Sequence, residues 1–168
     1  MSFRVRNFER SDRDACRRLW VELTEWHRKI YDSPTIGGDD PGRKFDEHLE
    51  RVGPHNLWLA ETDAGPIGMI GAVRGETECE LEPIIVTPAW RGRGVGSALA
   101  QIVVESARRR GDRYVLTRPV ARNHDALRFF HALGFDALSQ IELVADLRPR
   151  EQQQWRPGPW LAGRAFRL

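Results

Sequence analysis

The sequence of 168 residues predicts an α+β fold, in which a mixed, mostly antiparallel central sheet of about six or seven strands is flanked by about four helices. Short apolar stretches between residues 57 and 86 are separated by turn residues, which is typical of antiparallel hairpins. One strand–helix–strand crossover between Glu80 and Thr117 adds a parallel strand. Apolar residues also recur at helical spacing in the first third of the chain and after residue 123.

Turn residues and changes of apolar periodicity set the expected bounds of each element. The first part predicts a strand over residues 3–8, a helix from Ser11 or Asp12 to about Tyr31, a loop over 32–41 and a short helix over 43–51. The middle part predicts strands over 57–60, 67–74 and 78–86, a glycine-rich loop, a helix to about Arg110 and a strand over 114–117. Asn123 then caps a helix to about Leu133, Gly134 ends it, and two strands follow from Phe135, the clearer one over 140–147.

Residues 148–168 differ in composition from the rest of the chain, with three prolines, three glutamines and two tryptophans. We therefore expect one domain over residues 1–147 and a tail over 148–168 that ends in a strand from Arg164 to Leu168. Trp155 and Trp160 would pack on the parent domain or on a second subunit, so a homodimer is one of the two expectations.

The composition is that of an ordinary globular protein, 40% hydrophobic and 30% charged. No apolar run approaches a membrane span, and the first residues lack a signal-peptide core, so we expect a cytoplasmic protein without membrane contact. Cys16 and Cys79 are too few for a disulfide framework or a thiolate zinc site. The five histidines form no close pair, and no metal site is expected.

Charge is unevenly distributed along the middle of the chain. Residues 61–88 carry six acidic residues and one arginine, whereas residues 89–135 carry nine arginines and three acidic residues. One segment suits a cation and the next an anion, although two solvated faces would give the same pattern. A nucleic-acid partner is not expected, because the arginines are not interleaved with aromatic residues and the net charge is only +2.

The segment from Arg91 to Ser97 holds three glycines and two arginines, directly after an apolar strand and directly before a long helix. Glycines allow a ligand to approach the backbone, and the first turn of a helix offers unpaired N–H groups and a positive dipole end. The segment therefore predicts a phosphate or pyrophosphate site.

Three phosphate-binding loops compete for this segment. A P-loop needs a lysine before Ser or Thr, and none is present; the dinucleotide fingerprint needs a third glycine where Ser97 stands. The spacing that fits is R-x-x-G-x-G, formed by Arg91, Gly94 and Gly96 within V-x-P-x-x-R-G-x-G-x-G-x-x-L from Val86 to Leu99. It resembles the acetyl-CoA loop of the GNAT superfamily of N-acetyltransferases.

A second motif strengthens this resemblance. Residues 123–135 are similar to the family pattern N-x-x-A-x-x-F-Y-x-x-x-G-F, except that Phe130 stands where many members have Tyr. The resemblance covers about residues 3–147 and implies a sheet that splays open beside the strand of residues 79–86. Pro83 removes one donor from that strand and favours a bulge there.

The resemblance implies acetyl-CoA as the co-substrate and no metal. The pantetheine arm would pair with the backbone of Ile84, Ile85 and Val86, and a backbone N–H of Ile85 or Val86 would polarise the thioester carbonyl. The remaining cofactor-binding residues would be Arg91, Gly92, Arg93, Gly94, Val95, Gly96, Ser97, Asn123 and Phe130. In many members the tyrosine at this position is the general acid for the thiolate, and Phe130 cannot donate a proton. Ser97, Thr117, His131 or a water are the alternatives.

Acetyl transfer also needs a base that takes a proton from the acceptor amine. Glu80 and Glu82 alternate with Ile84 and Val86, so we expect all four side chains on one face of the strand, and either glutamate as the catalytic base, with Glu82 preferred. Two close carboxylates would disfavour double ionisation. The alternative is an exposed, solvated strand face.

The expected function is transfer of an acetyl group from acetyl-CoA to a primary amine by direct attack in a ternary complex. The alternative is an acyl-CoA-binding or sensing module that has lost turnover. A nucleotide-binding phosphotransferase is disfavoured, because no lysine or metal-binding carboxylate accompanies the loop. The acceptor would lie near Trp26, Tyr31 and the loop of residues 33–41, whose acidic residues suit a cationic amine; the sequence does not identify it.

Overall fold

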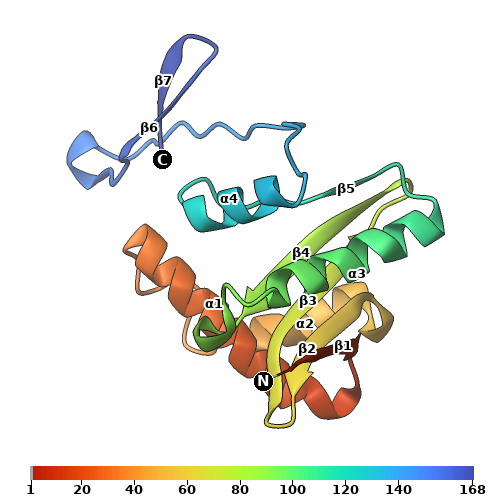
Figure 1. Cartoon of the computed structure of the whole chain (residues 1–168). Coiled ribbons are helices and arrows are strands. Elements are labelled where there is room, and N and C mark those ends of the chain that lie inside the picture. Colours follow the sequence, from red (N-terminus) through yellow and green to blue (C-terminus); the bar gives the residue numbers. More distant parts are fainter. Residues whose placement is uncertain (1) are drawn as a thin grey trace. The chain divides into compact units, whose positions relative to one another are not determined.

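The computed structural model describes residues 2–168, which form two compact units, one ending at Arg118 and one running from Pro119 to Leu168 (Figure 1). The first unit contains a five-stranded sheet in the order β1-β2-β3-β4-β5, and the second contains a separate pair, β6 and β7. The five-stranded sheet is antiparallel except between β4 and β5. The predicted fold class is confirmed, although two of the strands form their own sheet. The division predicted after residue 147 stays a prediction.

The bounds of most elements agree with those that periodicity predicts. The first unit consists of β1 (Arg4–Asn7), α1 (Arg13–Tyr31), α2 (Arg43–Val52), β2 (Leu57–Thr62), β3 (Gly65–Arg74), β4 (Glu78–Val86), α3 (Val95–Arg110) and β5 (Tyr114–Leu116). The second unit consists of α4 (His124–Ala132), β6 (Pro157–Leu161) and β7 (Arg164–Arg167).

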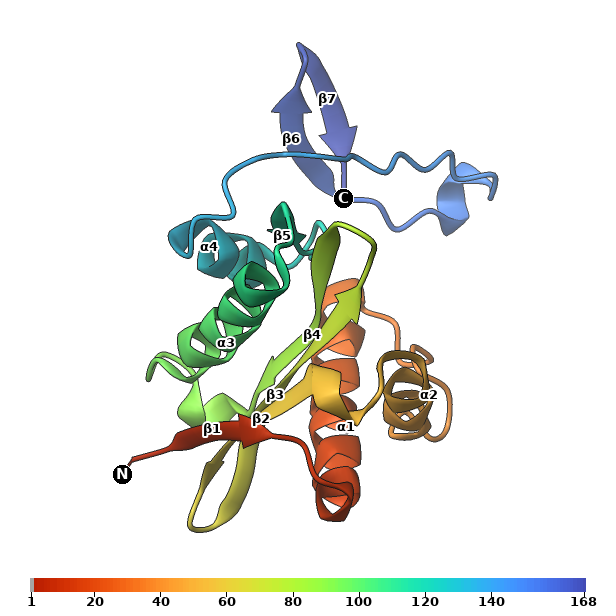
Figure 2. The ribbon, with the colours of Figure 1, turned by 90° about the vertical axis from the view of Figure 1, so that its right-hand side faces the viewer.

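Helices cover both faces of the five-stranded sheet: α1 and α2 lie on one face and α3 on the other (Figure 2). The core on the α1/α2 face is made of buried apolar side chains, namely Phe8, Cys16, Leu19, Phe45, Leu57, Leu59, Met69 and Ile85. Two guanidinium groups of α1 also hold α2, because Arg13 and Arg17 each bind the carboxylate of Asp46, at 2.8 and 2.6 Å. Both helices pack against β3, and α1 also packs against β4.

A β-bulge interrupts β4 at Glu82 and Pro83. Ile84 faces Ile70 of β3, but Leu81 faces Ala72, so two residues of β4 lie opposite the single residue Gly71. The bulge that Pro83 predicts is therefore present. The Glu82–Pro83 peptide bond is cis.

The expected common face of Glu80, Glu82, Ile84 and Val86 is wrong, and the bulge is the reason. Opposite residues of paired strands project to the same face, and Glu80 faces Val73 whereas Ile84 faces Ile70. Because residues 70 and 73 of a regular strand point to opposite faces, the one extra residue in β4 separates Glu80 from Ile84.

β4 and β5 separate soon after they pair. Their register runs from Glu78 opposite Tyr114 to Glu80 opposite Leu116, and β4 then continues for six more residues to Val86. Thr117 marks the point of separation, since its hydroxyl donates to the carbonyl oxygen of Leu81 at 3.4 Å. Within the first unit, β4 thus has an open edge from about Leu81 to Val86, in agreement with the expected splay.

The strand expected over residues 140–147 is wrong: residues 135–147 form no helix or strand. Apolar alternation favours a strand only where a neighbouring strand receives its hydrogen bonds. The hairpin of the second unit lies further on, where Ala162 and Gly163 both have positive φ, 48° and 70°, and make a tight turn. The strand expected from Arg164 to Leu168 is confirmed as β7.

Candidate cofactor and acceptor site

The glycine loop connects β4 to α3 through backbone conformations that glycine adopts at little cost. Gly92 and Gly94 have φ of 70° and 81°, and Gly94 is the N-cap residue of α3. The first helical bond runs from the N–H of Ala98 to the carbonyl oxygen of Gly94, so the N–H groups of residues 95–97 precede it. The loop therefore presents the positive end of a 16-residue helix.

Arg91 is held in place by two contacts. Its Nε donates to the carbonyl oxygen of Val86 at 3.0 Å, and its guanidinium lies 4.9 Å from the ring centroid of Trp26 in α1. Arg93 lies similarly over Trp90, at 5.3 Å. Residues 91–94 are all exposed, so two fixed cations stand beside the N-terminus of α3. This combination of N–H donors and guanidinium groups suits a pyrophosphate.

The open edge of β4 lies next to this loop along the chain. Ile84 and Val86 are partly buried and Ile85 is buried, so apolar side chains flank the open backbone edge. An extended chain with amide groups can add to such an edge as a strand does. The glycine loop follows the open edge directly along the chain. Together they fit an extended molecule that carries a pyrophosphate at one end and amides along its length.

Both candidate bases form ion pairs with arginines. Glu82 Oε1 lies 3.1 Å from Arg51 Nη2 of α2, and Glu80 pairs with Arg118, the last residue of the first unit. The side chain of Glu82 is 43% exposed and that of Glu80 is 18% exposed, so Glu82 is the more accessible. The guanidinium groups offset the repulsion expected between the two carboxylates.

Neither cysteine is placed to act as a nucleophile. Cys16 and Cys79 are both buried, and burial raises the pKa of the Cys16 thiol to about 12 and also raises that of Cys79. Cys79 and Glu80 are adjacent residues of β4 and point to opposite faces. Neither Cys16 nor Cys79 is therefore available as a reactive thiolate.

The predicted cofactor residues of the second unit serve local structure. Asn123 caps α4, since its Oδ1 accepts from the N–H of Ala126 at 3.1 Å, which confirms the predicted cap. Phe130 is 5% exposed and makes edge-to-face contacts with Phe129 and Phe135, at 5.1 and 5.5 Å between ring centroids. Their expected contacts with the cofactor stay predictions.

The loop expected beside the acceptor is fixed to α1. Arg28 donates to the carbonyl oxygens of Ile36 and Gly38 at 2.9 and 2.8 Å, and Arg17 binds Asp40 at 2.7 Å. Asp40, one of the carboxylates expected to attract a cationic amine, is thus already paired.

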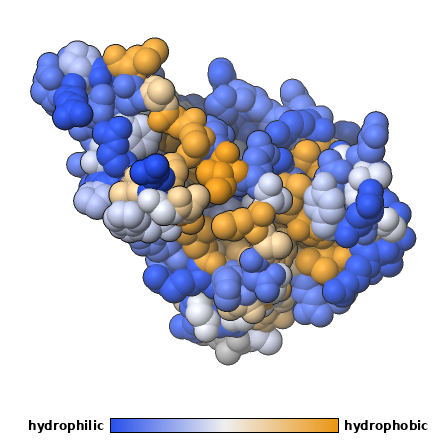
Figure 3. Space-filling model, turned by 90° about the horizontal axis from the view of Figure 1, so that it is seen from above, coloured by the Kyte–Doolittle hydropathy of each residue, from blue (hydrophilic) through white to orange (hydrophobic). Residues whose placement is uncertain are grey.

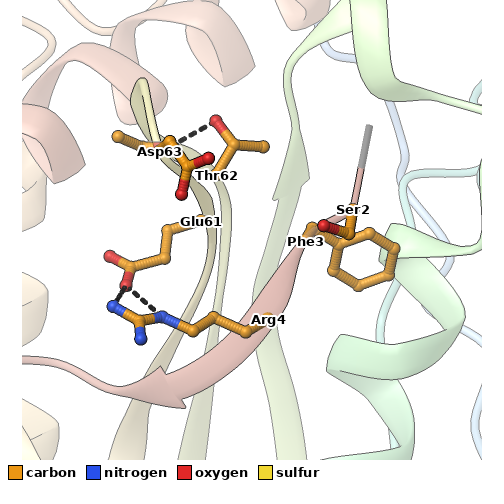
Figure 4. A pocket seen from close by; sticks show the side chains of 7 residues that line it. Ser2, Phe3, Arg4, Glu61, Thr62 and Asp63 are labelled. Carbon is orange, nitrogen blue, oxygen red and sulfur yellow. Dashed lines mark hydrogen bonds and ion pairs between the residues drawn. The ribbon is translucent and has the colours of Figure 1, made fainter.

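The structure shows two other surface features. A hollow beside the start of β1 and the β2–β3 turn is lined by polar groups, but Arg4 and Glu61 within it bind each other at 2.6 Å (Figure 4). In the second unit several large apolar side chains are exposed. The face of the molecule seen in Figure 3 shows apolar groups interspersed with polar ones. The exposed apolar side chains of the second unit are Leu127, Leu138, Ile141, Leu143, Val144, Leu147 and Trp160.

Within residues 2–168 no group of three potential metal ligands comes together. None of the helices that the structure describes is both long and apolar enough to cross a membrane.

Sequence reasoning missed the residues of α2 that reach β4. His48 is 3% exposed, contacts Arg51 and lies against Trp20, with ring centroids 5.3 Å apart. Their positions in the sequence could have indicated this. His48 and Arg51 fall at helical spacing with Phe45 and Leu49, which were expected to point inward. Arg118 had no such signal, because its partner is 38 residues earlier.

A mixed sheet with an open β4 edge and an anion-binding loop at the start of α3 defines the class of N-acetyltransferase folds. The sequence profile of the acetyltransferase (GNAT) family matches residues 20–135, and the chain belongs to this family. The predicted family is thereby confirmed.

Similar proteins carry related names. An uncharacterized N-acetyltransferase of Methanocaldococcus jannaschii is 25% identical over 142 residues, which are 80% of this chain and 61% of that protein. The N-alpha-acetyltransferase RimI of Mycobacterium tuberculosis is 34% identical over 103 residues, 58% of this chain and 63% of RimI. The chain thus spans about three fifths of these relatives. The PaiA N-acetyltransferase of Thermoplasma acidophilum, solved with coenzyme A, is 17% identical with a TM-score of 0.71, covering 84% of this chain and 94% of PaiA.

Proposed function

We propose that this protein transfers an acetyl group from acetyl-CoA to a primary amine, in a ternary complex and without a covalent enzyme intermediate. The observation that carries the proposal is the continuity of the open β4 edge with the glycine loop. The pyrophosphate of CoA would bind the loop and the first-turn N–H groups of α3, held by Arg91 and Arg93. The amides of the pantetheine arm would pair with the backbone of residues 84–86.

Glu82 is the proposed base. It is the more exposed of the two glutamates and lies at the bulge, where β4 leaves β5. The carboxylate takes a proton from the ammonium form of the acceptor, and the neutral amine nitrogen attacks the thioester carbon. The C–S bond then breaks, and a second proton passes from the nitrogen to the departing sulfur, which gives the neutral amide and the CoA thiol. The backbone N–H of Ile85 or Val86 is the proposed donor to the developing oxyanion.

The test is release of free CoA thiol from acetyl-CoA when a panel of amines is added. A general base is worth about 10²–10⁴-fold in rate, so Glu82→Gln should lower kcat by that order. Glu80→Gln is the matched variant on the same strand and should have the smaller effect. Unchanged rates in both variants would show that neither glutamate is the base.

A second candidate, an acyl-CoA-binding module without turnover, draws support from the ion pairs of Glu80 and Glu82 and from the buried Phe130, which cannot donate a proton. Calorimetric titration with CoA distinguishes the two. Both candidates predict binding that Gly94→Glu abolishes, but only the enzyme predicts thiol release with some amine of the panel.

A further inference from the structure

One nitrogen of Arg51 contacts both a candidate base and a buried histidine. Arg51 Nη2 lies 3.1 Å from Glu82 Oε1 and 3.0 Å from His48 Nδ1. An Nη nitrogen carries two hydrogens, so one can be donated to each acceptor. The contacts join α2 to the bulge of β4 through a row of three side chains.

His48 is suited to act as the acceptor at the buried end of this row. It is 3% exposed, and burial together with the charge of Arg51 lowers its pKa to about 4. The ring is therefore neutral near pH 7, and its contact with a guanidinium requires Nδ1 to be the unprotonated nitrogen. The hydrogen then resides on Nε2, for which the described residues offer no hydrogen-bond partner.

Gly71 brings His48 and the bulge together. A methyl group added at Gly71 would lie 2.4 Å from the carbonyl oxygen of Glu82 and 2.7 Å from His48 Nε2. Both groups therefore contact the bare backbone of β3 at the residue opposite the bulge. The ring of Trp20 also lies against the imidazole, at 5.3 Å between ring centroids, so both Trp20 and Gly71 confine His48.

We propose that Arg51 is a positioning residue that orients the carboxylate of Glu82, and that His48 in turn fixes the guanidinium of Arg51. Glu82 is 43% exposed, and an unsupported glutamate at such a position samples several rotamers. Arg51 engages Oε1, which leaves Oε2 to take the proton of the acceptor. This inference rests on the proposed function, in which Glu82 is the base.

The first test is non-additivity in kcat. Arg51→Gln should lower kcat about tenfold in the wild-type background and leave kcat unchanged in the Glu82→Gln background, because Arg51 acts only through Glu82. Arg43→Gln is the matched control: Arg43 lies on the same helix, is exposed and pairs with Glu47. Equal losses in both backgrounds would assign Arg51 a merely structural role and overturn the proposal.

Rescue by the conservative variant is a second readout that a structural role would not change. Arg51→Lys keeps a cation beside Glu82, so it should regain most of the kcat that Arg51→Gln loses. KM should be unchanged in both variants, because the defect lies in the orientation of the base and not in substrate binding. An Arg51→Lys variant as slow as Arg51→Gln would contradict the proposal.

A third measurement needs no turnover. ¹⁵N NMR of the full chain should show His48 with its hydrogen on Nε2, and in Arg51→Gln its pKa should rise. If His48 shows the Nδ1–H form, the row of contacts is absent and the inference is wrong. If the row is present but wild-type protein releases no thiol with any amine, the proposed function fails and the role of Arg51 in catalysis fails with it. A slower Glu82→Gln with an unaffected Arg51→Gln overturns this inference alone.

Discussion

The guanidinium of Arg91 lies 4.9 Å from the ring centroid of Trp26, so the glycine loop rests on the C-terminal half of α1. The same side chain donates from Nε to the carbonyl oxygen of Val86. Contacts with α1 and with the end of β4 thus determine the position of the Arg91 guanidinium. A pyrophosphate that binds the loop would meet a preorganised charge, which reduces the entropy lost on binding.

Trp26→Ala should weaken CoA binding without changing the fold of the loop. A cation–π contact is worth about 0.5–2 kcal/mol, so we expect the Kd of CoA to rise about 2–30-fold. Calorimetric titration measures this directly. Trp160→Ala, at a tryptophan that is 73% exposed, serves as the control and should leave the Kd unchanged. An unaltered Kd in Trp26→Ala would show that the stacking does not support the site.

The two ends of α3 offer a matched pair of glycines. Gly94 and Gly111 are its N-cap and C-cap residues, both have positive φ, and an added methyl group would meet no atom within 4 Å at either. Each substitution by alanine should therefore lower the free energy of unfolding by about 1–2 kcal/mol. Only Gly94→Ala should also weaken CoA binding. Thermal unfolding and CoA titration of both variants check this, and equal Kd values would place the pyrophosphate elsewhere.

Local patterns predicted most elements of the first unit and the start of α4 in the second. The ends of α1 and α3 and the cap of α4 follow from periodicity and from single residues such as Asn123, whose information is contained within a few positions. The glycine loop was predictable for the same reason. Pro83 even indicated the bulge.

The features that were not predicted depend on which strand or helix packs against a segment. Local sequence patterns do not contain this information. The separation of Glu80 from Ile84 onto opposite faces follows from the register with β3. The partners of both glutamates, Arg51 and Arg118, lie more than 30 residues away in sequence. Residues 140–147 alternate as a strand would, but the structure gives them no pairing there.

Asp12 joins β1 to the turn before α1. Its carboxylate accepts from Arg6 at 2.7 and 2.8 Å and from the N–H of Glu9 at 2.8 Å, and the bond from Arg6 holds its pKa below the usual range. Asp12→Asn removes the charge and should lower the free energy of unfolding by about 1–3 kcal/mol. Asp14→Asn, at an exposed position two residues on, is the control. Denaturant unfolding at pH 7 measures both, and equal midpoints would contradict the assigned role.

The buried His48 should make the protein sensitive to mild acid. Its pKa is lowered to about 4 in the folded protein by burial and by Arg51, against about 6.5 in the unfolded chain. Between these values the unfolded chain binds a proton that the folded protein does not, so the free energy of unfolding falls as the pH falls from about 6.5 to about 4. The contribution is fully present above pH 6.5, and its loss amounts to roughly 2–3 kcal/mol.

His48→Gln removes this titration, so its unfolding free energy should depend less steeply on pH over that interval, whatever its absolute stability. His55→Gln, at an exposed histidine just beyond α2, should keep the wild-type slope. Urea unfolding at a series of pH values from 4 to 7 provides the comparison. Identical slopes for wild type and His48→Gln would mean that the folded protein accommodates a charged His48 at little cost. The imidazole would then be less confined than its distances from Trp20 and Gly71 indicate.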